Sequence, residues 1–153
     1  MTETCDLFLT HAWRYHEDWK HMIDVLNTQG VRTWRNFSLP WYDPALDPRT
    51  PEGGEIVRRN LESQIIPSDA VVLLSGVYEQ VGCRKWVDME VDMARRHGKL
   101  IIAVPAIGAT QPSAEVRALA DVVMGWDGAA IIVAAREFKA RGTRTATVGV
   151  NTT

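Results

Sequence analysis

The stretch that decides the fold is "SDAVVLLSGVYEQVGCRKWVDMEVDMARRHGKLIIAV" (residues 68–104). Its apolar run at 70–75 predicts a strand buried on both faces, and the run at 99–105 predicts another. Between them, the residues from about Arg84 to His97 have helical apolar spacing and end at Gly98. A strand, a helix and a strand in this order predict a βαβ unit with two parallel strands.

The rest of the chain repeats this alternation. Further strands are expected at 5–10, 31–37 and 122–126, and further helices at 16–30, 55–66, 112–120 and 129–140. The class is therefore α/β: a flavodoxin-like three-layer sandwich with a five-stranded, mainly parallel sheet in the order 2-1-3-4-5 and helices on both faces.

Two segments lie outside this alternation. The segment 38–54 holds four prolines and two glycines, which predicts a long loop. Residues 141–153 have no apolar face of their own, so we expect a domain over 1–140 followed by a flexible tail. On the 55–66 helix, Ile56, Leu61 and Ile65 are expected to face the core, and Val57 is a further candidate for the same face.

Bulk composition argues against several partners. A net charge of −2 over 153 residues gives no field that would draw nucleic acid or an anionic membrane. Apolar runs stay well short of the roughly 20 residues that span a bilayer, and the N-terminus has no signal-peptide pattern. The two cysteines form no CxxC motif, so we expect reduced thiols in a cytoplasmic protein.

A sheet of this order binds ligands outside the carboxyl ends of its strands, where the strand order reverses. That point receives "THAW" (10–13), the start of the 38–54 segment and "SGVY" (75–78). Thr10 and Ser75 are equally suited to ribose hydroxyls and to capping strand ends. Trp13 and Tyr78 are equally suited to stacking on a ring and to packing.

Several chemistries common on this fold lack their residues here. No GxGxxG, P-loop or GxSxG motif follows a predicted strand, and no phosphoacceptor aspartate ends the third strand. His16 and His21 are five residues apart, off one helical face, which is poor spacing for a metal site. We therefore expect no metal and no bound cofactor.

Once these chemistries are set aside, Glu90 is the remaining candidate for a functional residue. Most glutamates on a helix are solvated surface charges. Asp88 and Asp92, which lie on other faces of the same helix, are expected to be solvated surface charges. A carboxylate beside aromatic side chains also suits chemistry at a sugar anomeric carbon, whose transition state resembles an oxocarbenium ion. Trp86, one turn earlier, is as suited to packing as to substrate contact.

These residues resemble a known family. "DLFLTHAW" (6–13) resembles the first box of TIR domains, and in "WVDME" (86–90) the Trp-to-Glu spacing matches their third helix. Together with "WRNFSLP" (34–40) and Asp43-Pro44, the pattern is most similar to the bacterial TIR-like group of Thoeris anti-phage defence, the ThsB proteins. The resemblance covers roughly residues 5–137.

The resemblance implies an activity. Such TIR enzymes cleave the nicotinamide N-glycosidic bond of NAD⁺, which is a substrate and not a cofactor. ThsB-like proteins make a cyclic or conjugated ADP-ribose signal that diffuses to a separate effector, ThsA. The family's catalytic glutamate falls on Glu90, its substrate-packing aromatic on Phe8 and its small polar position on Thr10-His11. Ala12 and Trp13, which follow directly, are also expected to contact substrate.

The same resemblance implies that the 38–54 loop gates the site and mediates self-association. Trp41, Tyr42 and Asp43 lie in that loop and are expected near substrate or at an interface. Two other readings stay open: a non-catalytic TIR interaction module, and a nucleoside 2-deoxyribosyltransferase-like enzyme in which Asp43 supplies a second acid.

Overall fold

The computed structural model describes residues 4–11, 16–30, 32–38 and 49–142. The strands are β1 (Cys5–Leu9), β2 (Trp34–Asn36), β3 (Ala70–Leu74), β4 (Leu100–Val104) and β5 (Val122–Val123). The helices are α1 (Glu17–Asn27), α2 (Pro51–Ile65), α3 (Ser75–Glu79), α4 (Arg84–Arg96), α5 (Ala114–Leu119) and α6 (Gly128–Ala140).

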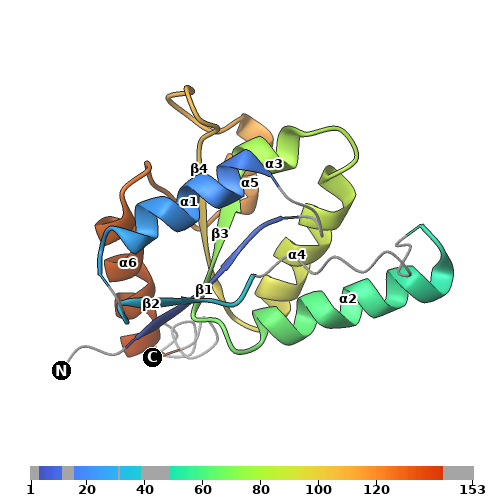
Figure 1. Cartoon of the computed structure of the whole chain (residues 1–153), viewed down its shortest axis with the longest axis horizontal. Coiled ribbons are helices and arrows are strands. Elements are labelled where there is room, and N and C mark those ends of the chain that lie inside the picture. The colour runs from blue at the N-terminus through green and yellow to red at the C-terminus, as the bar shows by residue number, and fades with distance from the viewer. Residues whose placement is uncertain (1–3, 12–15, 31, 39–48, 143–153) are drawn as a thin grey trace, which may run out of the picture.

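The strands form one sheet in the order β2-β1-β3-β4-β5, and every pairing is parallel. Helices α1 and α6 lie on one side of the sheet, and α2 and α4 lie on the other (Figure 1). The predicted flavodoxin-like sandwich and its strand order are confirmed. The order reverses between β1 and β3, where Phe8 pairs with Val71.

The central strands β1, β3 and β4 are buried along their whole length. Helices on both faces require this, because a sheet covered twice has no polar face. Trp19, Met22 and Leu26 of α1 are buried against one face. Val57, Leu61 and Ile65 of α2 contribute to the same continuous core from the other side. On both helices, each of these buried residues lies three or four positions from the next, which is the spacing of one helical face.

The start of α2 corrects the sequence prediction. The helix begins at Pro51, so residues 51–54 belong to it and not to the preceding loop. Thr50 caps it, since its hydroxyl accepts a hydrogen bond from the Gly53 N–H at 3.0 Å. Proline suits the first turn, whereas glycine disfavours helix interiors, so Gly53 and Gly54 obscured the start.

The buried face of α2 differs in one residue as well. Val57 is fully buried, whereas Ile56 is 41% exposed. Rotation by one residue moves a side chain by about 100° around a helix, so only one of the two neighbours can face the core. The expectation that Ile56 packs inward was wrong, whereas Val57, the further candidate for this face, is buried in the core.

Two other elements differ from the predictions. Residues 75–79 form the short helix α3, which brings the described helices to six, and Ser75 is its first residue and not the end of β3. A helix of five residues has too few turns to show apolar periodicity. Strand β5 has two residues, not five, and both valines are exposed at the sheet edge.

The helix caps follow local sequence. Ser113 caps α5, with its hydroxyl accepting from the Val116 N–H at 3.3 Å. Helix α6 ends at Ala140, close to the predicted domain end, and residues 143–153 of the predicted tail lie outside the described residues. Within the part of the chain that the structure describes, no helix combines the length and apolarity needed to cross a bilayer.

Candidate active site

Glu90 lies at the middle of α4 and is completely buried. Asp88 and Asp92, two residues to either side, are both exposed, as predicted. Helical geometry separates residues two apart by about 200°, so the middle carboxylate faces inward while its neighbours face solvent. Burial excludes the reading of Glu90 as a solvated surface charge. A buried carboxylate needs hydrogen-bond donors in compensation.

One donor is the main chain just after β1. The backbone N–H of His11 donates to Oε2 of Glu90 at 3.3 Å, across 79 residues of sequence. This contact joins the carboxyl end of β1 to α4. It brings together two of the residues predicted for the site. They lie at the carboxyl ends of the strands, at the point where the strand order reverses.

The side chain of His11 is itself fully buried. Its ring lies 5.3 Å from the ring of Phe8 and 6.4 Å, edge-on, from the ring of Trp19. Burial lowers the pKa of His11 to about 4, although a hydrogen bond with Gln64 acts in the opposite direction. The imidazole is therefore neutral near pH 7.

Thr10 is fully buried, and its hydroxyl accepts a hydrogen bond from the backbone N–H of Leu74 at 3.0 Å. Its own N–H donates to the carbonyl of Val72 at 3.0 Å. These bonds tie the ends of β1 and β3 together, which is the capping role weighed for Thr10 above. Ser75, the next residue along from Leu74, is also buried.

The start of α3, which follows β3 directly, lies close to α1. A Cβ atom added at Gly76 would lie 2.0 Å from Oδ2 of Asp18 and 3.6 Å from the Cβ of Ala106. Asp18 is only 7% exposed and lies in the first turn of α1. The carboxylate therefore occupies the space at Gly76, and only glycine allows the two elements to come this near.

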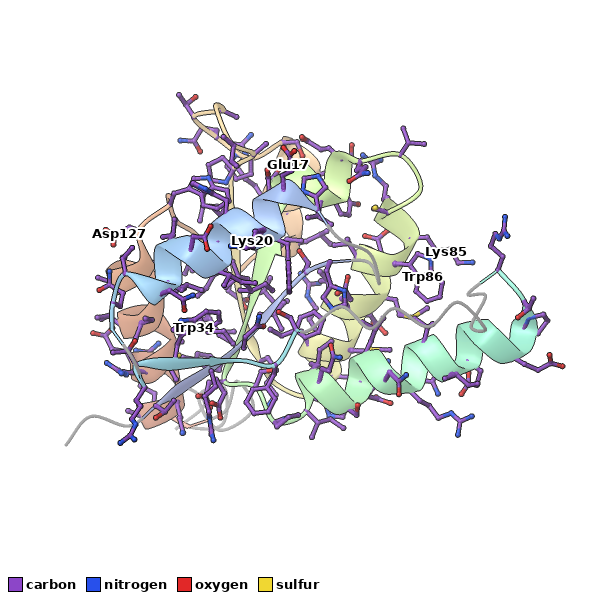
Figure 2. The ribbon with its side chains drawn as sticks, viewed as in Figure 1. Glu17, Lys20, Trp34, Lys85, Trp86 and Asp127 are labelled. Carbon is purple, nitrogen blue, oxygen red and sulfur yellow. The ribbon has the colours of Figure 1, made fainter. Side chains whose placement is uncertain are left out.

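Tyr78 and Trp86 lie on the neighbouring elements α3 and α4. Tyr78 is 5% exposed, and the Arg84 guanidinium lies 4.8 Å from its ring centroid. Desolvation, with a hydrogen bond to Asp88, raises the pKa of Tyr78. Trp86 is half-buried against the core, and Lys85 lies next to it on α4, with Nζ 6.0 Å from the indole (Figure 2).

The remaining predicted substrate contacts lie outside the described residues: Ala12, Trp13, Trp41, Tyr42 and Asp43. Phe8 is described, and it is a fully buried core residue of β1. The structure thus brings Phe8, His11 and Glu90 together. Thr10 and Ser75 lie beside them at the strand ends. Tyr78 lies on α3, and Trp86 lies on α4. Over the described residues, no cluster of three metal-ligating side chains occurs.

Sequence reasoning missed three residues that shape this region. Trp19 reads as a core residue of α1, yet its ring faces His11 and its Nε1–H donates to the Ser38 hydroxyl at 3.2 Å. Gln64 lies in a polar helix segment with no signal of contact with His11. Asp18 reads as a helix N-terminal charge. Each contact spans different elements, so no local pattern reveals it.

A separate pocket lies at the end of the strands opposite to the one near Glu90. It encloses about 200 Å³ and is lined by Ser68, Asp69, His97, Gly98, Lys99, Phe138, Lys139 and Gly142. Asp69 and Lys99 directly precede β3 and β4, so this pocket is at the amino ends of the strands. It is therefore distinct from the region around Glu90.

The geometry defines an α/β domain with a buried glutamate at the switch point of its sheet. Residues 8–111 match the model of the family described as "Thoeris protein ThsB, TIR-like domain". The match covers most of the domain, including the end of β1, the whole of α4 and Glu90, and the chain belongs to this family.

Other comparisons are more distant. No curated protein matches the chain. Five chains of solved structures match it, and one of them is the Clostridium botulinum CMP N-glycosidase BcmB. That structure shares 17% sequence identity with a TM-score of 0.45, over 78% of this chain and 87% of its own.

Proposed function

We propose that this protein is an enzyme that cleaves the nicotinamide N-glycosidic bond of NAD⁺ and converts the ADP-ribosyl group into a cyclic or conjugated signal. The observation that carries the proposal is the burial of Glu90 at the switch point of a ThsB-type TIR-like domain. The signal would activate a separate ThsA-like effector in anti-phage defence. Both steps would take place in the cytoplasm.

The chemistry suits a single carboxylate. When the bond between C1″ and the nicotinamide nitrogen breaks, its electron pair moves to the pyridinium ring, which leaves as a neutral molecule. Positive charge develops on the ribose C1″ and ring oxygen, and no proton is needed by the leaving group. A carboxylate in a dry site stabilises that charge far more than one in water.

The second step decides the product. A hydroxyl or a ring nitrogen of the same ADP-ribose, or another small molecule, would attack C1″ and lose its proton. Attack from within the molecule gives a cyclic product, and attack by another molecule gives a conjugate. Glu90 is completely buried, so the groups that cover it have to move before NAD⁺ can reach it.

The test is a nucleotide profile. The full chain and its Glu90→Gln form are expressed in bacteria challenged with phage, and small molecules are read by mass spectrometry. We expect an ADP-ribose derivative that falls at least about 100-fold in Glu90→Gln, because one electrostatic stabiliser supplies this much rate. Asp92→Asn, an exposed carboxylate on the same helix, is the matched control and should keep the product.

A Glu90→Gln protein that keeps the product would overturn the proposal. The hydrogen bond from His11 also supports a second role, in which Glu90 only joins β1 to α4 and the domain is a non-catalytic interaction module. That role predicts no Glu90-dependent nucleotide under any challenge. It also predicts that Glu90→Gln keeps self-association, because glutamine accepts the same bond.

A further inference from the structure

We propose that the pocket at the amino ends of β3 and β4 binds a phosphate group, either free or as a small ester, through the ammonium groups of Lys99 and Lys139. The inference goes beyond the proposed function, because it concerns a different ligand and the end of the sheet opposite to Glu90. No motif in the sequence predicts this site, since Lys99 directly precedes a strand whereas Lys139 lies near the end of a helix.

Separate segments of the chain meet at the pocket. Residues 68–69 come from the turn before β3, residues 97–99 from the turn before β4, and Phe138, Lys139 and Gly142 from the end of α6. Helix α6 covers one face of the sheet and α4 the other, so the pocket spans the end of the sheet (Figure 1). Its volume of about 200 Å³ is below the roughly 300–1,000 Å³ of sites for drug-sized ligands. The pocket therefore suits a phosphate group or a small ester and not a dinucleotide such as NAD⁺.

Helix ends near the pocket do not exclude an anion. Helices α2, α4 and α6 all end on this side, and the carboxyl end of a helix carries a partial negative charge. Local donors already meet carbonyls in their last turns. The Ser68 hydroxyl donates to two carbonyls of α2 at 2.9 Å, the Lys99 N–H to a carbonyl of α4 at 2.8 Å, and the Gly142 N–H to the Lys139 carbonyl of α6 at 3.1 Å. Because these carbonyls are capped, the charged side chains decide which ligand the pocket favours.

The charged side chains that line the pocket have a positive balance. Two ammonium groups, of Lys99 and Lys139, share the pocket with one carboxylate, of Asp69. Oδ2 of Asp69 accepts the backbone N–H of Asp6 at 2.9 Å, so part of this carboxylate is engaged by β1. Its Oδ1 lies 3.7 Å from Nζ of Lys139, which is an ion pair longer than a hydrogen bond. The fourth titratable group, His97, contacts Glu62 with its Nε2 at 3.0 Å.

Lys99 supplies a second reason for an anion. Burial lowers the pKa of Lys99, and the charge of Asp69 acts in the opposite direction. An ammonium that has lost part of its hydration gains more from a bound anion than a solvated one does. A phosphate group carries about −1.5 to −2 charges at pH 7, and two ammonium groups match this charge better than that of a monovalent anion. Phe138, half-buried at the same pocket, offers an apolar surface to the rest of a small ester.

The test is a titration of the full-length protein with inorganic phosphate, followed by amide NMR spectra at an ionic strength held constant with sodium chloride. We expect saturable shifts of the amide signals of Ser68, Gly98 and Gly142. Lys99→Gln and Lys139→Gln should each weaken phosphate binding at least about tenfold, because each removes a charged hydrogen-bond donor. Lys20→Gln is the control with the same change of charge: Lys20 is exposed on α1, where it pairs with Asp24, and its loss should not alter the affinity (Figure 2).

A second probe, ribose 5-phosphate, distinguishes the two sources of the phosphate group. Tighter binding of this ester than of inorganic phosphate assigns the pocket to a small phosphate ester. Equal or weaker binding of the ester assigns the pocket to free phosphate. If Lys99→Gln does not fold, Lys139→Gln carries the test, because its side chain is 43% exposed and its replacement leaves the core intact.

The absence of saturable shifts with either probe would overturn the inference, as would wild-type affinity in folded Lys139→Gln. These results are separable from failure of the proposed function. Glu90→Gln should bind phosphate as the wild type does, because Glu90 lies at the other end of the strands. If Glu90→Gln keeps the nucleotide product while phosphate binding depends on Lys99 and Lys139, the proposed reaction is wrong and the phosphate site stands.

Discussion

A carboxylate lies near each end of strand β1. The two carboxylates accept hydrogen bonds from different kinds of group. Near the amino end, Asp6 forms a bidentate pair with Arg35 at 2.6 and 2.8 Å, and its main chain exchanges hydrogen bonds with Asp69. At the carboxyl end, Glu90 accepts a backbone N–H from His11 at 3.3 Å. Arg35 is 62% exposed at its side chain, whereas Glu90 and His11 are completely buried.

The difference separates a carboxylate paired for structure from one placed for chemistry. A guanidinium fork satisfies both oxygens of Asp6 and leaves little for a ligand. A backbone N–H orients a carboxylate without neutralising it, because an amide dipole carries no net charge. The stability and activity of the domain should therefore be most sensitive to pH and to substitution at the carboxyl end of β1. They should be least sensitive at the amino end of β1.

The largest of these effects is the response of stability to acid. Folded His11 stays neutral down to about pH 4, whereas an unfolded histidine takes up a proton below 6.5. The unfolded state binds more protons in this window, so stability falls as the pH drops from 6.5 to 4 and then levels off. The expected loss is about 3 kcal/mol, from about 1.4 kcal/mol for each unit of pKa difference.

Urea titrations across this pH range measure that loss, and His11→Phe is the control, since it cannot titrate. The lowered pKa values of Glu55 and Glu62 cause losses only below their ordinary value of 4.5, so their contribution lies at the acid end of the range. A wild-type curve that is as flat as the His11→Phe curve between pH 6.5 and 4.5 would contradict the prediction.

An intermediate effect is expected at the start of α3, where Gly76 is the second residue. Gly76→Ala places a methyl group 2.0 Å from Oδ2 of Asp18, so α1 and α3 have to separate or Asp18 has to turn away. Overpacking of this kind costs about 1–3 kcal/mol, measured by chemical denaturation. Gly108→Ala is not a suitable control, because that glycine has a φ of +88°.

Gly125 is the better control: its φ is not in the left-handed region, and nothing lies within 4 Å of an added Cβ. Gly125→Ala should leave stability nearly unchanged. Combining Gly76→Ala with Asp18→Ala should recover part of the loss, because the clash is with the Asp18 carboxylate. A Gly76→Ala protein as stable as Gly125→Ala would show that α1 and α3 adjust at no cost.

The smallest effect is expected at the amino end of β1. Asp6→Asn removes the charge that Arg35 meets, but asparagine still accepts a hydrogen bond, and the Arg35 side chain is 62% exposed, so its guanidinium stays solvated without the pair. The melting temperature should fall by no more than about 4 °C. The yield of the Glu90-dependent product per folded molecule should not change. A loss of product in folded Asp6→Asn would remove the functional distinction between the two ends.

Much of the fold was predictable because its signals are local. The unbroken apolar runs of β3 and β4 mark strands covered on both faces, and the helical spacing around Glu90 marks α4. The start of α2 and the five-residue α3 were not predictable, since one carries two glycines and the other is too short for periodicity. Glu90 stood out from its position after a predicted buried strand and from the Trp-to-Glu spacing.

By itself, the sequence determined the class of fold, the strand order, the family resemblance and the identity of the candidate carboxylate, because each depends on patterns within one or two neighbouring elements. Only the tertiary structure decided that Glu90 is buried, that the main-chain N–H of His11 donates to it, and that the ring of Trp19 faces the buried ring of His11. Those contacts join residues up to 79 positions apart. Packing of α1, α2 and α4 around the end of β1 creates them, and no periodicity along the chain encodes such a meeting.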